Sequence, residues 1–132
     1  MRRLLAMVLL CGSALAATPA TPINSSPQVQ SALEETRALL SLPVACGEPE
    51  AWQIDGDVTQ IGQFLLDQIE ARNWSIMHHQ PLSLSYAVIA DPNPDDPDAI
   101  ALGGITLDAA QHGIAFLSEC RLADNSGTLV RR

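Results

Sequence analysis

Apolar residues recur at helical spacing in two segments of the first half of the chain. In residues 27–42 an apolar stripe lies opposite charged residues, and Pro27 suits the first helical turn. In residues 57–72 the stripe is wider, and Asp57 and Gln60 form a capping-box pattern. The stripes consist of Val29, Ala32, Leu33, Thr36, Leu39 and Leu40, and of Val58, Ile61, Phe64, Leu65, Leu66 and Ile69. Both segments are predicted to be amphipathic helices.

The second half of the chain has the period-2 alternation that is typical of β-strands. It is clearest in residues 82–91 and 113–122, and residues 74–80 are strand-like as well. In residues 99–107 the apolar positions change phase after the pair Gly103-Gly104. A one-residue change of phase at glycine predicts a β-bulge at that point.

The order of these elements is two helices followed by three or four strands with short links. Short links favour an antiparallel meander, and the absence of alternating βαβ units opposes a doubly wound fold. The sequence predicts an α+β fold in which two N-terminal helices pack on one face of a three- to four-stranded antiparallel sheet. One domain is expected over residues 27–123, between a flexible leader at 18–26 and a mobile tail at 124–132.

The first residues have the pattern of a secretory signal peptide. Arg2 and Arg3 precede a short apolar run, and Ala14 and Ala16 form a small-x-small cleavage site, which predicts removal of residues 1–17. The run is too short to span a membrane, which takes about 20 residues. We therefore expect a periplasmic or secreted protein that is not inserted in the membrane after cleavage. Lipidation at Cys11 is the weaker alternative, because Leu10 is bulky where a small residue is required.

Two cysteines, Cys46 and Cys120, remain after cleavage. Two unpaired thiols rarely persist in an oxidising compartment, so they are predicted to form a disulfide that encloses 73 residues. A redox pair and a zinc site are the alternatives. The chain has no C-x-x-C motif, and no histidine lies at zinc-finger spacing from the cysteines.

The charge of the chain limits its partners. Fifteen acidic residues and five arginines follow residue 17, which gives a formal net charge of −10, and the chain has no lysine. This balance excludes a nucleic-acid-binding role, which needs a basic patch, and opposes binding to anionic membranes. A cationic protein or a metal ion would be attracted electrostatically, but maintenance of solubility is the favoured role of the charge. The oligomeric state is left open.

Two groups of residues are candidates for chemistry. Residues 91–98 read "DPNPDDPD", and Asp91, Asp95, Asp96 and Asp98 form an acidic interaction loop with ligands that suit calcium. The spacing departs from a calcium loop, because no glycine or glutamate stands where that loop needs them, so a rigid solvated loop is favoured. The second group is formed by His78, His79 and His112. If His78 and His79 lie in a strand, they point to opposite faces and cannot chelate one ion together.

The sequence favours a small exported acidic binding or accessory domain of the cell envelope or the medium. No recognisable catalytic, cofactor-binding or metal-binding motif is present, so a function other than catalysis is preferred and no cofactor is expected. Binding is expected to use an edge strand, the acidic loop at 91–98, or both. The alternatives are a small extracytoplasmic hydrolase that uses a histidine and a carboxylate, and a calcium-stabilised structural module.

Overall fold

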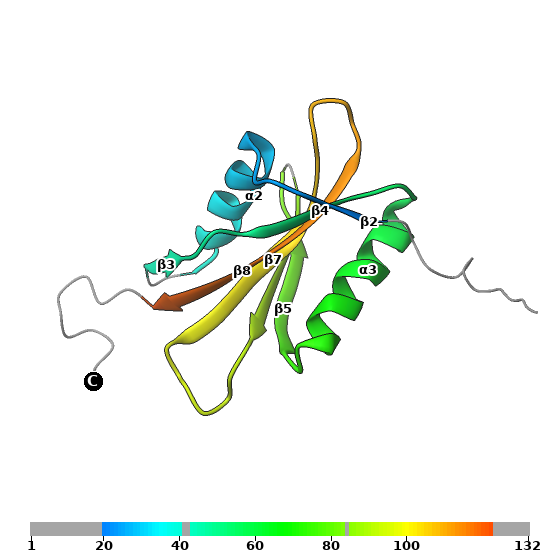
Figure 1. Cartoon of the computed structure of the whole chain (residues 1–132). Coiled ribbons are helices and arrows are strands. Elements are labelled where there is room, and N and C mark those ends of the chain that lie inside the picture. The colour runs from blue at the N-terminus through cyan, green and yellow to red at the C-terminus, as the bar shows by residue number, and fades with distance from the viewer. Residues whose placement is uncertain (1–19, 41–42, 84, 123–132) are drawn as a thin grey trace, which may run out of the picture.

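All seven strands in the described part of the chain belong to one antiparallel sheet, which two helices flank (Figure 1). The computed structural model describes residues 20–40, 43–83 and 85–122. In chain order the elements are β2 (Ala20–Ile23), α2 (Pro27–Arg37), β3 (Val44–Cys46), β4 (Glu50–Ile54), α3 (Val58–Ala71), β5 (Ser75–Pro81), β6 (Tyr86–Asp91), β7 (Ala99–Leu107) and β8 (Gly113–Leu122). The strands lie in the order β2-β4-β8-β7-β6-β5, and β3 also pairs with β8.

β8 is the strand around which the sheet is built. One side of β8 pairs with the whole of β7, from Leu107↔Gly113 to Ala99↔Arg121. The other side pairs with β4 along its first half and with β3 at its end. Residues 113–118 of β8 are all buried. A strand in this position is covered on both of its faces.

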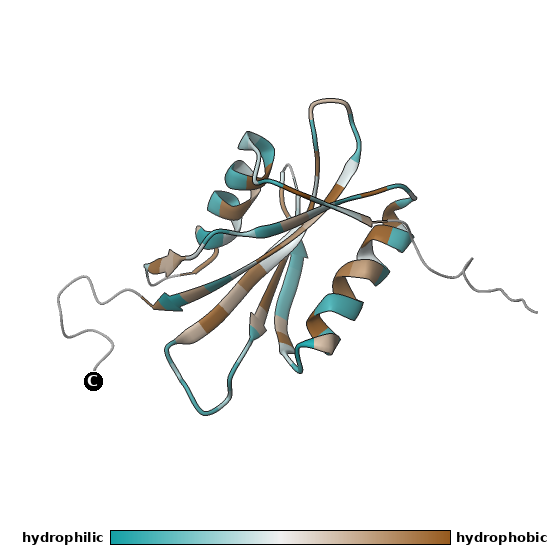
Figure 2. Ribbon diagram, viewed as in Figure 1, coloured by the Kyte–Doolittle hydropathy of each residue, from teal (hydrophilic) through white to brown (hydrophobic). Residues whose placement is uncertain are grey.

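The two helices cover opposite faces of the sheet (Figure 1). Successive side chains of a strand point to opposite faces. In β8, Phe116 lies in the core on the α2 side, whereas Ala115 and Leu117 lie in the core on the α3 side. The helices contribute Val29, Ala32 and Leu33 of α2 to the first core, and Ile61, Leu65 and Ile69 of α3 to the second. Hydrophobic colour accordingly runs through the central strands in Figure 2.

The predicted fold class is therefore wrong in two respects. The predicted α+β arrangement had both helices on one face of a sheet of three to four strands, but the sheet has seven strands and a helix on each face. The additional strands β2, β3 and β4 have only three to five residues each. Segments this short carry no detectable periodicity, and pairing with longer strands defines them. β2 also lies within the segment that was expected to be a leader.

The predicted β-bulge at Gly103-Gly104 is also wrong. β7 pairs with β6 and β8 without any change of register, and the only shift in strand pairing among the described residues lies in β5, between Ile76 and His78. The glycines serve close packing instead. A Cβ atom on Gly104 would lie 2.2 Å from the Tyr86 carbonyl oxygen. Both faces of β7 are covered: Ile100 and Leu102 pack in the core on the α2 side and Ile105 in the core on the α3 side, so the apolar positions change phase without a bulge.

The helix termini agree with the local sequence. Asp57 and Gln60 form the predicted capping box at the start of α3. Asn73 has a φ of 60° where the chain leaves that helix, which asparagine tolerates better than most residues. The predicted signal peptide at 1–17 and the tail at 124–132 lie outside the described residues.

Candidate functional site

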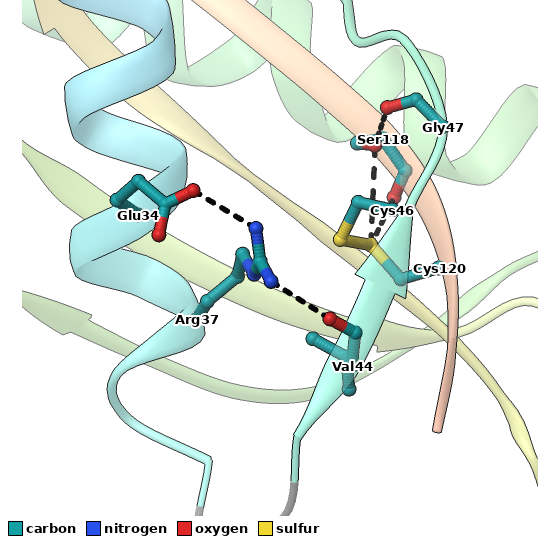
Figure 3. The surroundings of a disulfide bond; sticks show 7 residues. All are labelled: Glu34, Arg37, Val44, Cys46, Gly47, Ser118 and Cys120. Carbon is teal, nitrogen blue, oxygen red and sulfur yellow. Dashed lines mark hydrogen bonds and ion pairs between the residues drawn. A yellow bond between two sulfur atoms is a disulfide. The ribbon is translucent and has the colours of Figure 1, made fainter. Parts of the chain in front are cut away.

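The predicted disulfide is present and joins Cys46 of β3 to Cys120 of β8 (Figure 3). The two residues are direct cross-strand partners, with 4.0 Å between their Cα atoms. Beside them, the Ser118 hydroxyl donates a hydrogen bond of 2.8 Å to the Gly47 carbonyl. Cys120 is only 3% exposed, so the bridge is part of the core. A structural disulfide fits a protein of an oxidising compartment.

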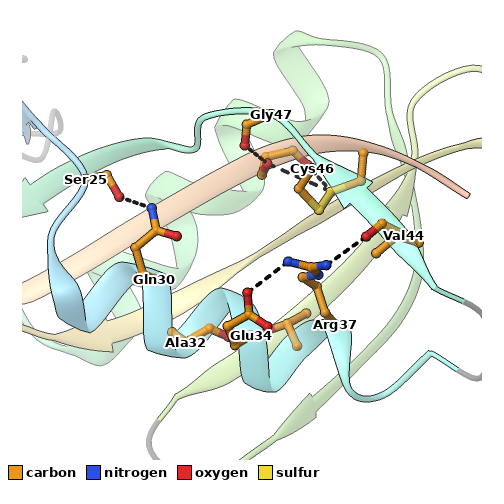
Figure 4. Close-up of polar contacts among 11 residues, drawn as sticks. Ser25, Gln30, Ala32, Glu34, Arg37, Val44, Cys46 and Gly47 are labelled. Carbon is orange, nitrogen blue, oxygen red and sulfur yellow. Dashed lines mark hydrogen bonds and ion pairs between the residues drawn. A yellow bond between two sulfur atoms is a disulfide. The ribbon is translucent and has the colours of Figure 1, made fainter. Parts of the chain in front are cut away.

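Arg37 holds α2 against β3 next to this disulfide (Figure 4). Its guanidinium donates to the Glu34 carboxylate at 2.8 Å and to the Val44 carbonyl at 2.8 Å. At the other end of the helix, the Gln30 side-chain amide donates to the Ser25 hydroxyl. Of these contacts, the bond from Arg37 to Val44 joins α2 to the sheet, and the other two stabilise the helix itself.

The acidic loop connects β6 to β7 and is ordered by its own side chains. Asp91 and Asp96 accept hydrogen bonds of 3.0 and 3.1 Å from backbone N–H groups two residues further on. Asp96 also accepts one of 2.8 Å from Arg121, which lies 3.9 Å from Asp98. The bond from the Arg121 side chain lowers the pKa of Asp96 below its usual value, with help from the backbone N–H of Asp98. Asp91 and Asp95 are the two carboxylates of the loop that Arg121 does not bind.

The three histidines have three separate environments. His78 Nε2 lies 2.8 Å from the Gln80 side-chain oxygen, and His79 Nδ1 contacts the Tyr86 hydroxyl. As predicted for a strand, His78 and His79 pair with successive residues of β6 and so lie on opposite faces. His112 lies in the β7–β8 loop. Among residues 20–40, 43–83 and 85–122, no three metal-ligating side chains converge.

An apolar groove runs between α3 and the outer strands of the sheet. We call it the α3–β5 groove; its two adjoining parts have volumes of about 410 and 380 Å³. Its principal lining residues are Val58, Gly62, Leu66, Ile76, Tyr86 and Ile105. Of the five large hydrophobic side chains that are exposed in the described ranges, four line the groove: Val58, Leu66, Ile76 and Leu107. Such a concentration of exposed apolar side chains is typical of a binding surface.

The groove opens onto an edge of the sheet. β5 is the last strand in the order and pairs with β6 alone among the described strands. Six of its seven residues are exposed, and Ile76 and His79 also line the groove. β5 has no lysine, arginine, aspartate or glutamate, so it lacks the charges that commonly protect an exposed edge. The shift in pairing after Ile76 and the terminal Pro81 interrupt the edge only locally.

The surroundings of the groove are acidic. Asp57 precedes Val58 at the start of α3, and Asp67 and Glu70 follow Leu66 on the exposed side of the same helix. The Gln63 side chain, which lines the groove, donates to the Asp67 carboxylate at 2.9 Å. Each arginine in the described ranges is paired with a carboxylate at 2.7–2.8 Å: Arg37 with Glu34, Arg72 with Glu50, and Arg121 with Asp96. The remaining acids leave a strongly negative surface.

The sequence indicated only part of this site. It proposed binding by the acidic loop or by an edge strand that it did not specify, and it assigned Val58 to the buried stripe, whereas Val58 is 74% exposed. The apolar pair Ile76-Met77 in a strand of polar residues was the one local signal of an exposed apolar edge. Comparison with protein-family models, curated proteins and solved structures found no match to this chain. Function therefore has to be inferred from the site itself.

No helix among the described residues has the length and apolar character needed to cross a membrane.

Proposed function

We propose that this chain is a small exported acidic domain of the cell envelope or the medium that binds a protein partner through the α3–β5 groove. The signal-peptide pattern of residues 1–17 and the Cys46–Cys120 disulfide support export. The observation that carries the binding function is the groove, because four exposed large aliphatic side chains gather in it beside an open strand edge.

The energetic argument is that these side chains are in contact with water in the isolated chain. Full burial of a fully exposed aliphatic side chain of this size is worth about 1.5–3 kcal/mol before the entropy cost of association. Leu66, Ile76 and Leu107 are 39–46% exposed, so each would contribute roughly half of that or less, and Val58, at 74%, would contribute more. Burial of several such side chains together is enough to support a specific interface. The charge around the groove favours a cationic partner and speeds its encounter with the domain.

Site-specific photo-crosslinking in the cells that produce the chain tests this proposal. A photoreactive amino acid at position 66 or 76 places the probe in the groove, and the same probe at position 21 places it on the exposed part of β2, at the opposite edge. We expect one shared adduct from the two groove positions and none of that mass from position 21. Absence of an adduct from both groove positions, or the same adducts from all three, would contradict the proposal.

A small hydrolase is the second candidate, and one contact favours it. Asp108 lines a pocket of about 540 Å³ together with Ser31 and Ser83, and its carboxylate lies 3.2 Å from His112 Nδ1. The backbone N–H of His112 donates to Asp108 and lowers the pKa of that carboxyl group, which favours the carboxylate form of Asp108 beside the His112 ring. Within the described ranges, however, His112 has no contact with a serine hydroxyl, which nucleophilic catalysis of this kind requires.

Ester hydrolysis by the wild type and by His112→Ala separates the two functions. Under the hydrolase hypothesis, His112→Ala abolishes turnover of a small activated ester such as p-nitrophenyl acetate, while His78→Ala retains it. Equal rates for both variants and the wild type would exclude His112 as a catalytic base. No observation in the described part of the chain favours the calcium-stabilised module.

A further inference from the structure

We infer that the partner presents an extended peptide segment of alternating apolar and basic residues, which adds to the sheet as a new strand beside β5. Its apolar side chains enter the α3–β5 groove, and its basic side chains lie on the other face, toward the acidic loop. This inference rests on the proposed binding function and specifies the chemistry of the partner.

The main chain of β5 provides the first part of the recognition. A strand at the edge of a sheet presents backbone N–H and C=O groups that a further strand can pair with. β5 spans seven residues, Ser75–Pro81, which is about 23 Å of edge. A peptide strand of about six or seven residues matches that length. The backbone hydrogen bonds between the peptide and β5 would form with any peptide sequence, so the side chains of the peptide supply the specificity.

The groove provides the second part. Ile76 and His79 belong to β5 and line the groove at the same time. A strand added next to them places every second side chain on the α3 face of the sheet. Those side chains lie alongside Ile76 and reach toward Leu66 across the groove. Because the lining is mostly apolar, the matching side chains are aliphatic or aromatic.

Charge provides the third part. The other set of side chains of the added strand lies on the α2 face. Asp91 is the cross-strand partner of Ser75 at the end of β5. It lies on the α2 face, because it is two positions from Ile89 in β6 and Ile89 belongs to the core on that face. The acidic loop continues from it, and Arg121 neutralises Asp96 and reaches Asp98 but not Asp91 or Asp95. Arginine or lysine in the peptide is complementary to these two carboxylates. A second copy of this acidic chain is disfavoured by the same charges.

The test uses the disulfide-bonded protein purified after export and labelled ten-residue peptides of alternating valine and arginine. N–H groups in a strand alternate in direction with the same period as side chains. One peptide is N-methylated at every valine and a second at every arginine, so that only one of them loses the N–H groups that face β5. Fluorescence anisotropy then gives the affinity of each peptide at several salt concentrations. A valine–glutamate peptide of equal length is the charge control.

Strand addition predicts that one methylated peptide loses about tenfold or more in affinity while the other retains it. Ile76→Asp and Leu66→Asp should each weaken binding of the unmethylated peptide by about tenfold or more, as expected for loss of a buried aliphatic contact. These variants add negative charge, so a purely electrostatic complex would bind more tightly. Thr21→Asp on β2 adds the same charge at the other edge and should leave the affinity within about twofold. Asp91→Asn and Asp95→Asn should each cost about two- to fivefold at low salt.

Several outcomes would overturn the inference. Equal affinity of the two methylated peptides excludes strand addition, and tighter binding by Ile76→Asp reduces the interaction to charge alone. Tight binding of the valine–glutamate peptide excludes a basic partner. A dimer in solution that Ile76→Asp dissociates identifies a second copy as the occupant of the edge. If any of these results appears while photo-crosslinks still form from position 66 in cells, the binding function holds and only the peptide mode fails.

Discussion

Opening the Cys46–Cys120 disulfide should lower the free energy of unfolding by about 4 kcal/mol. The two cysteines are 74 positions apart in the sequence, and cross-linking a chain over that separation removes conformational entropy from the unfolded state worth about 4 kcal/mol at 25 °C. This is a large share of the 5–15 kcal/mol that is usual for a whole domain. For a chain of this length the corresponding fall in melting temperature is about 15 °C.

Urea unfolding followed by circular dichroism measures this effect in the oxidised and the reduced protein. The double variant Cys46→Ala/Cys120→Ala, also measured under reducing conditions, is the matched control. Its difference from the reduced wild type measures the packing contribution of the two cysteine side chains, of which Cys120 is 3% exposed. The fold itself should survive reduction, since β7 and β4 still pair with β8 and Ser118 still bonds to Gly47.

A change of less than about 1 kcal/mol between the oxidised and reduced proteins would refute the reasoning. It would mean that the unfolded chain gains little freedom when the bridge opens. Complete loss of the β-sheet spectrum on reduction would refute it from the other side, because it would show that strand pairing around β8 depends on the covalent link.

Three further predictions test packing and charge. Gly104→Ala should destabilise the protein by about 1–3 kcal/mol in urea unfolding, because the new methyl group meets the backbone of β6. Gly62→Ala, whose Cβ would have only a 3.9 Å contact, should instead stabilise the protein by about 0.5–1 kcal/mol. A change of stability with the same sign in both variants would contradict the packing described. Arg72→Ala should cost about 1 kcal/mol in thermal unfolding, since the guanidinium stacks on Trp52 and Trp74 at 5.9 and 5.5 Å; full stability of Arg72→Ala would show that this stacking contributes nothing. The hydrogen bond from Arg121 lowers the pKa of Asp96 in the folded state. Ionised Asp96 therefore stabilises the fold above pH 3.8, and this stabilisation disappears as the pH falls through the lowered pKa. The difference in free energy of unfolding between the wild type and Asp96→Asn should vanish in acid, and a difference that grows there would contradict this assignment.

Local sequence determined the features that depend on neighbouring residues. The capping box at Asp57, the start of α2 at Pro27 and the left-handed residue at Asn73 all follow from side chain and backbone chemistry within a few positions. The four long strands were also detectable, because alternation over six or more residues is a strong signal. The disulfide could be predicted because only two cysteines follow the expected cleavage site.

The number of strands and the placement of the helices were decided by tertiary structure. β8 is buried on both faces, so Ile114 and Ala115 are equally buried although they point to opposite helices. When both faces of a strand are apolar, its sequence contains no information on which helix covers which face. For the same reason, the change of phase in β7 resembled a bulge, although the strand is regular and has apolar residues in both cores.

The candidate site depended most on tertiary structure. Val58, Leu66 and Leu107 have the same apolar chemistry as the core residues around them, and their exposure arises because α3 leaves part of its face of the sheet uncovered. Sequence alone determined which residues are apolar, where the helices begin and which cysteines pair. Which apolar residues stay in contact with solvent was decided by how two helices and seven strands fit together, because burial is a property of the whole arrangement and not of any one segment.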